Sequence, residues 1–265
     1  MLQLFDLAHH EFKMSIRRPS LWIAYGLLMA FFVGSLVLPF SDDPARVDAQ
    51  NVISGANLWQ YAGEYVFQFN VFLPIVVGIL VADRMQRDFR LGVRELQEST
   101  PLSLGTYILG KYLGVLSSMF LPVFAWIIAL GVLLPALSLA PWEMAYALPV
   151  ACLAITLPAF AFVTAFSLAC PLVMPLRVYQ ILFVGYWFWG NFISPEFFPT
   201  INGTLLTAGG SIVFNGFFGG FPARNPGPLE YTAVYASLNL IVLALCIVAV
   251  LVTLYVYIGK KAQRA

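Results

Sequence analysis

Long apolar stretches without Asp, Glu, Lys or Arg recur along the chain, separated by shorter polar segments. A helix that crosses a bilayer needs about 20 mostly apolar residues, because each residue adds about 1.5 Å toward a hydrocarbon thickness of about 30 Å. Six stretches approach this length, so the pattern predicts six transmembrane helices in one all-α integral membrane domain, residues 1–265. The predicted spans are Leu21–Phe40, Tyr65–Ala82, Tyr112–Leu134, Met144–Cys170, Val178–Ile193 and Tyr231–Ile258.

A further uncharged stretch, Ile201–Ala223, is also long enough to cross, but glycines interrupt it and weaken a continuous helix. A crossing here would also place the basic C-terminus on the opposite side from the other basic segments. We therefore expect short re-entrant or interfacial pieces within an external segment, residues 194–230. The glycines are Gly203, Gly209, Gly210, Gly216, Gly219 and Gly220.

Lys and Arg residues indicate the orientation, because short loops that carry them stay on the cytosolic side. Of the 14 Lys and Arg residues, only Arg46 and Arg224 fall in loops expected outside. The pattern predicts a multi-pass protein of the plasma or inner membrane with its N-terminus and C-terminus in the cytosol. The composition, 60% hydrophobic and 10% charged with a mean hydropathy of +0.84, leaves too little charge to cover a soluble globule.

The first twenty residues mix apolar and charged side chains, which predicts a helix lying in the membrane interface. The chain's three cysteines all fall in predicted spans, so we expect free thiols. His9 and His10 are adjacent and would point about 100° apart on a helix, so they do not form a shared metal site by themselves. We expect neither a metal site nor a nucleic-acid partner.

The segment between the second and third spans, residues 83–110, is longer than a connector needs. Apolar residues recur at helical spacing from Met85 to Leu96, which predicts an amphipathic helix continuing from the second span. Thr100 before Pro101 is a typical helix start, so we expect a break and a second short helix in this cytosolic elbow. Opposite charges four residues apart predict the intrahelical pairs Asp83–Arg87, Arg84–Asp88 and Arg94–Glu98.

Catalytic chemistry has little support in the sequence. Gly105, Gly110 and Lys111 have the spacing of a nucleotide-binding P-loop, but Tyr112 stands where a Ser or Thr would contact Mg²⁺. The predicted spans contain no His, Asp or Glu that could serve as a base or a proton relay. We therefore predict no catalytic site and no enzymatic activity in this chain.

The elbow also carries a motif in which an acidic residue precedes Thr-Pro-Leu-Ser and then Leu-Gly-Lys. This motif, together with the predicted topology, resembles the permease subunits of type-2 ABC exporters. The Gly-Thr pair that often follows the acidic residue in that family is replaced here by Leu96 and Gln97. The motif residues are Glu95, Thr100, Pro101, Leu102, Ser103, Leu109, Gly110 and Lys111.

The resemblance implies a transmembrane subunit of an ATP-driven exporter. A second permease, identical or homologous, would complete the translocation path, and separate ATP-binding subunits would hold ATP and Mg²⁺. The resemblance also implies that the elbow docks on an ATP-binding subunit and couples its closure to the spans. The residues implied in this contact are Glu95, Glu98, Thr100, Pro101 and Ser103, flanked by Arg90 and Arg94.

Scattered polar residues inside the spans leave two interpretations open. They either line a translocation path or form interhelical hydrogen bonds, which contribute about 0.6 kcal/mol on average. Nothing in the spans identifies a cargo, so a non-transporting membrane subunit that anchors or regulates another complex is the alternative function. The polar residues are Gln68, Asn70, Thr156, Asn191 and Asn239.

Overall fold

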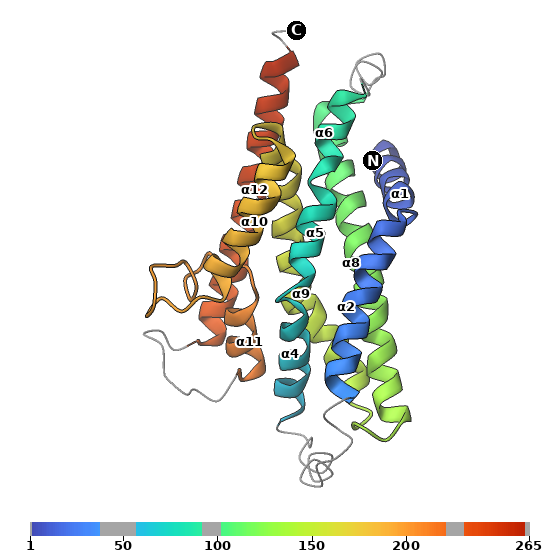
Figure 1. The fold of residues 1–265 in the computed structure, drawn as a ribbon, viewed down its shortest axis with the longest axis vertical. Coiled ribbons are helices and arrows are strands. Elements are labelled where there is room, and N and C mark those ends of the chain that lie inside the picture. Colours follow the sequence, from blue (N-terminus) through green and yellow to red (C-terminus); the bar gives the residue numbers. More distant parts are fainter. Residues whose placement is uncertain (1, 38–56, 92–101, 221–230, 263–265) are drawn as a thin grey trace.

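The computed structural model describes residues 2–37, 57–91, 102–220 and 231–262. Every regular element in these residues is a helix, and most helices run along the long axis of one bundle (Figure 1). This confirms the predicted all-α class. The elements are α1 (Leu2–Ile16), α2 (Pro19–Val37), α4 (Leu58–Phe69), α5 (Leu73–Val81), α6 (Asp83–Arg90), α8 (Leu104–Ala136), α9 (Met144–Ala169), the 3-10 helix η3 (Cys170–Leu172), α10 (Leu176–Asn191), α11 (Ser211–Phe218) and α12 (Ala233–Ala262).

Four helical stretches in the described residues are long and apolar enough to cross a membrane, so the chain is a multi-pass membrane protein. They correspond to the predicted second, third, fourth and sixth spans. The described residues of the predicted first span are helical, in α2, and most of the fifth is helical, in α10, but α10 has 16 residues and is only about 24 Å long. The total of six spans therefore remains a prediction. The four stretches are Leu58–Arg90, Leu104–Ala136, Met144–Leu172 and Ala233–Lys260.

The first long stretch contains α4, α5 and α6 nearly end to end, with a break at residues 70–72. Pro74 explains the break, because proline has no N–H to bond the carbonyl of Asn70, four residues earlier, and its ring crowds that carbonyl. The stretch begins at Leu58 and not at Tyr65 as predicted, since Ala62 and its neighbours on one face of α4 are buried in the bundle.

The helix α8 begins at Leu104 and not at Tyr112 as predicted. The Ser103 side chain caps it by accepting a hydrogen bond from the Thr106 backbone N–H at 3.2 Å. The separate short helix expected before the third span is therefore wrong for residues 102–111, which form the cap and the first turns of α8 itself.

The helix α9 lies in the middle of the bundle and packs against α4, α5, α8 and α12 (Figure 1). Its buried face alternates small alanines with larger side chains such as Phe160. Because lipid is as apolar as these side chains, close packing holds spanning helices together more than the hydrophobic effect does. The thiols of Cys152, Cys170 and Cys246 are free, as predicted.

Between α10 and α12, the described residues form turns followed by the short helix α11. With eight residues, α11 is about 12 Å long and too short to cross a bilayer. It packs against α4, α9 and α12, and a Cβ added to Gly63 of α4 would lie 2.7 Å from Phe218. The described residues of this segment therefore form no seventh crossing, and their re-entrant position remains a prediction.

Candidate functional site

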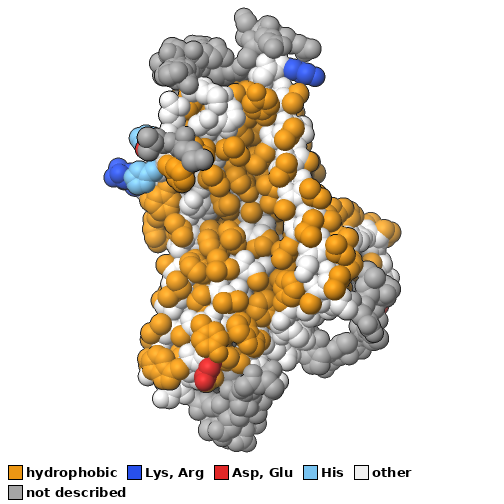
Figure 2. Space-filling view, turned by 180° about the vertical axis from the view of Figure 1, so that it is seen from behind, with side chains coloured by type: hydrophobic (Ala, Val, Ile, Leu, Met, Phe, Trp, Pro, Cys, Tyr) orange, Lys and Arg blue, Asp and Glu red, His pale blue; other side chains and the backbone are white. Residues whose placement is uncertain are grey.

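One end of the bundle brings together α1, α6, the first turns of α8 and both ends of the chain (Figure 1). Figure 2 shows a largely apolar surface on which the visible Lys, Arg and His side chains lie toward this same end. We call it the charged end. The polar groups buried there are arranged by contacts between helices that are far apart in the sequence.

Lys111 of α8 is the central buried cation, with a side chain that is 0% exposed. Its Nζ donates hydrogen bonds to Glu11 Oε1 of α1 at 2.8 Å and to Asp88 Oδ2 of α6 at 2.5 Å. The Tyr107 hydroxyl donates to the same Asp88 oxygen at 2.6 Å. Charge-assisted hydrogen bonds thus join three helices. We call Glu11, Asp88, Tyr107 and Lys111 the Lys111 cluster.

Two glycines on α8 let α1 approach closely enough for these bonds. A Cβ on Gly110 would lie 2.8 Å from Leu7 Cδ2, and one on Gly114 would overlap the backbone oxygen of Ala8 and lie 2.7 Å from Glu11 Cβ. Small residues four positions apart allow helix backbones to come together in membranes. This close approach places Glu11 within reach of the lysine that follows Gly110.

A second ion pair connects the junction of α1 and α2 to the start of α6. Arg18 Nη1 lies 3.3 Å from Asp83 Oδ1, with side chains 23% and 36% exposed. Because solvent screens a partly exposed pair, it contributes only about 0 to 1 kcal/mol. It nevertheless gives α6 a second attachment to the N-terminal part of the chain.

The predicted intrahelical pairs Asp83–Arg87 and Arg84–Asp88 are wrong. Within the described residues, the carboxylate of Asp83 pairs with Arg18 and that of Asp88 pairs with Lys111. Neighbours one turn apart on an exposed helix contribute only about 0.2 to 0.5 kcal/mol. For Asp88 the partner on another helix is favoured because burial strengthens its interaction with Lys111. The third predicted pair, Arg94–Glu98, lies outside the described residues.

Arg84 of α6 has no comparable partner. The residue is 2% exposed, and its Nε, Nη1 and Nη2 atoms form no hydrogen bond with any described residue. On α1, Glu11 Oε2 and Ser15 Oγ are also buried without a hydrogen-bond partner among the described residues. The charged end therefore holds a paired lysine beside buried polar atoms that the described residues leave unpaired.

The residues predicted to contact an ATP-binding subunit are only partly described. Arg90 lies exposed at the end of α6, where its Nη2 donates to Gln86 Oε1 at 2.7 Å. Ser103 is the exposed cap of α8. These two residues lie on either side of residues 92–101. Arg94, Glu95, Glu98, Thr100 and Pro101 are outside the described residues.

Two of the polar residues predicted inside the spans bond to the backbone of the segment before α11. Asn70, at the break between α4 and α5, donates from Nδ2 to the Ile155 oxygen at 3.1 Å and to the Gly209 oxygen at 3.3 Å. Asn191, at the end of α10, accepts the Gly209 backbone N–H at 2.6 Å. The amides therefore satisfy non-helical backbone that would be costly to leave unpaired.

Asn239 of α12 contributes in the same way, donating from Nδ2 to the backbone oxygens of Leu205 at 2.9 Å and Thr207 at 3.0 Å. We call Asn70, Asn191 and Asn239 the clamp asparagines. Of the other two predicted residues, Gln68 is exposed on α4 and Thr156 is buried on α9. A role for any of the five in a translocation path remains a prediction.

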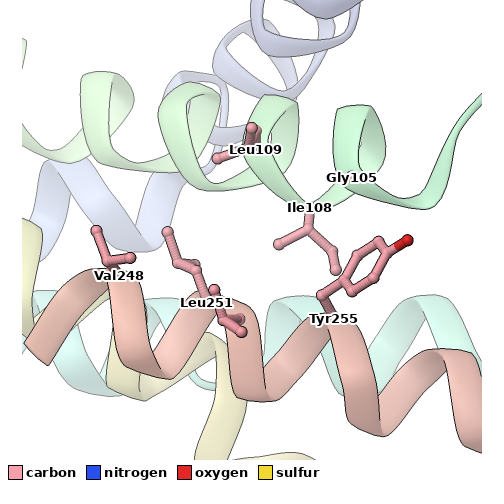
Figure 3. Close-up of a pocket in the computed structure, with 7 residues that line it drawn as sticks. Gly105, Ile108, Leu109, Val248, Leu251 and Tyr255 are labelled. Atoms are coloured by element: carbon pink, nitrogen blue, oxygen red, sulfur yellow. The ribbon is translucent and has the colours of Figure 1, made fainter.

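An apolar groove runs between the start of α8 and the second half of α12 (Figure 3). Its volume is about 250 Å³, and no lining residue carries a charge. Tyr255 and Ile108 face one another across the groove in Figure 3. The groove offers space for apolar groups but no partner for an ion. Its lining residues are Gly105, Ile108, Leu109, Val248, Leu251, Val252 and Tyr255.

Sequence reasoning missed Glu11, Tyr107 and Asp88 as partners of Lys111, which it placed at the boundary of the third span. A lysine inside an apolar helix is a signal that a carboxylate must lie nearby. The P-loop spacing of residues 105–112 is also explained, because these residues are helical and the lysine is held by two carboxylates. Within the described residues, no group of three or more His, Cys, Asp and Glu side chains could hold a metal.

Comparison with known proteins agrees with this architecture. A family model described as ABC-2 family transporter protein matches residues 5–195, which include most of α1, the Lys111 cluster and the helices through α10. Neither the comparison with curated proteins nor that with solved structures found a match. The family model covers well over half of the chain, and the chain is therefore a member of the ABC-2 transporter family.

Proposed function

We propose that this chain is the transmembrane subunit of an ATP-driven ABC exporter, with both termini in the cytosol. It would form the translocation path with a second permease, identical or homologous, and couple to separate ATP-binding subunits that carry ATP and Mg²⁺. Family membership and the apolar helices support the permease assignment. The observation that carries the coupling mechanism is the Lys111 cluster.

In this mechanism, the ATP-binding subunit pushes on the elbow. Contact would be made by Glu95, Glu98, Thr100, Pro101 and Ser103, with Arg90 and Arg94 flanking it. Within the elbow, α6 precedes residues 92–101 and α8 begins after them, and the Asp88–Lys111 bond joins these two helices directly. A push on either helix would therefore displace both.

The Lys111–Glu11 bond extends the same movement to α1. Because an uncompensated buried charge is costly, α6 and the start of α8 would stay joined through Asp88 and Lys111, and Glu11 would pass their displacement on to α1. The amphipathic α1 in the membrane interface would then act as a lever between the elbow and the first span. Because the separate subunits would bind and hydrolyse ATP, this mechanism needs no nucleotide site within the chain.

Among the predicted path residues, Gln68 remains the candidate whose side chain is exposed. The clamp asparagines would instead hold the external segment against α4, α9, α10 and α12. A path between two permease bundles would be lined mainly by apolar side chains, which favours a hydrophobic or amphipathic cargo. Membrane lipid would cover the remaining outer surface.

The experiment that tests coupling is the ATPase rate of the purified complex in nanodiscs. We expect Glu95→Arg to lower the rate at least fivefold, because it reverses the charge at the proposed contact. Glu143→Arg is the matched control, since Glu143 is exposed before α9 and remote from the elbow. An unchanged rate in Glu95→Arg would contradict the docking assignment and favour the alternative, a membrane subunit that anchors or regulates another complex.

A further inference from the structure

The guanidinium of Arg84 needs an explanation, because a buried charge without hydrogen bonds is strongly unfavourable. Its three nitrogens are unpaired among the described residues, although the residue is 2% exposed. Buried polar groups without partners are rare in native proteins, and each one calls for a physical reason. The surroundings of Arg84 supply one.

Four charged groups act electrostatically on Arg84: Arg18 and Arg87 repel it, whereas Asp83 and Glu11 attract it. Asp83 is already engaged by Arg18. Glu11 uses only Oε1 to bind Lys111 and leaves Oε2 buried and unpaired. Of the two carboxylates that attract Arg84, Glu11 is therefore the one with an unused buried oxygen.

The geometry of α6 places Arg84 one turn from Asp88, the carboxylate that binds Lys111, so Arg84 and Lys111 can compete for Glu11. Arg84 and Asp88 are four residues apart on α6, so they lie on one face about 6 Å apart along its axis. Asp88 is already bound to Lys111, which also holds Glu11. A displacement of α6 and α8 past α1 by less than one turn would bring Arg84 toward Glu11 in place of Lys111.

We propose that Arg84 is a positioning residue that provides the second partner for Glu11, which passes from Lys111 to Arg84 when α6 moves against α1. Lys111 keeps Asp88 throughout, so no carboxylate loses its counter-charge during the exchange. Ser15, one turn after Glu11, supplies a hydroxyl that can accept a hydrogen bond from the incoming guanidinium. The inference deepens the proposed coupling function and depends on it.

The test is a distance measurement between α1 and α6 in the complex with its ATP-binding subunit, reconstituted in nanodiscs. Spin labels at His10→Cys and Leu91→Cys report this distance, because both positions are exposed. We expect the distance distribution to shift between the nucleotide-free and the vanadate-trapped state. In Arg84→Gln we expect the shift to be lost, and in Arg84→Lys, which keeps the charge, we expect it to be retained.

The thermal stability of Arg84→Gln is the control for correct folding. We expect it to equal or exceed that of the parent, because the substitution removes an unpaired buried charge. A full shift in a stably folded Arg84→Gln would overturn the exchange while leaving the coupling function intact. If the parent itself shows no shift with trapped nucleotide, the proposed coupling through α6 fails together with the exchange. Loss of the shift in Arg84→Lys as well as Arg84→Gln would also contradict the exchange, since charge would not be the determining property.

Discussion

Single residues at the charged end show how a membrane protein accommodates ionisable groups in its interior. The ammonium of Lys111 is fully buried, and two carboxylates and the face of the Tyr107 ring surround it, with Nζ 5.7 Å from the ring centroid. These partners offset the cost of burying the ammonium, because desolvation of an isolated charge is unfavourable. Removal of the lysine should therefore be more harmful than removal of an exposed lysine nearby.

We predict that Lys111→Met lowers the free energy of unfolding by about 3 to 5 kcal/mol, because Asp88 loses its counter-charge and Glu11 is left with the unbonded Arg84 alone. Unfolding in mixed micelles with increasing SDS would measure the change. Lys13→Met is the matched control, since Lys13 is exposed on α1 and should change stability by less than about 0.5 kcal/mol. Equal effects of the two variants would contradict a structural role for the Lys111 cluster.

At the scale of elements, the contact between α1 and α8 depends on Gly110 and Gly114. We predict that Gly114→Leu displaces α1 and lowers the free energy of unfolding by about 1 to 3 kcal/mol, because the added atoms overlap the Ala8 backbone. Thermal unfolding in detergent would test this against Gly185→Leu, in which the new side chain meets nothing within 4 Å. A Gly114→Leu variant as stable as Gly185→Leu would show that α1 does not pack on α8 as described.

The clamp asparagines make a different prediction at the same scale. Asn239→Leu leaves the backbone oxygens of Leu205 and Thr207 without their donor, so we expect a loss of about 1 to 3 kcal/mol and faster proteolysis between α10 and α12. Gln68→Leu serves as the control because Gln68 is exposed on α4. If only Gln68→Leu altered stability, the assignment of the asparagines to the backbone would be wrong.

The positions of the helices could be predicted from the sequence better than the contacts between them. Apolar length and periodicity predicted α6, α9 and α12 because these properties are local. The break at Asn70 and the cap at Ser103 also have local causes, but stronger apolar signals nearby concealed them. The partners of Asp88 and Lys111 could not be predicted from spacing, since a residue's neighbour one turn away competes with distant residues that only the fold brings close.

At the scale of the whole molecule, the charged end and the opposite end should lie on different sides of the membrane. We predict that single cysteines at His10 and Leu91, in a chain lacking the native thiols, react with a membrane-impermeant maleimide only in inside-out vesicles. Cysteines at Trp142 and Phe197, exposed beyond the other ends of the helices, should react only in intact cells. Labelling of all four from the same side would contradict the orientation.

The central claim is that this chain is a permease driven by a separate ATP-binding subunit. It is tested most directly by purifying the tagged chain from its native cells in nanodiscs and measuring the identity and stoichiometry of copurifying proteins by mass spectrometry. We predict one ATP-binding subunit for each permease chain, in a complex that contains two permeases. A stable complex without any ATP-binding subunit would contradict the coupling function and support an anchoring role.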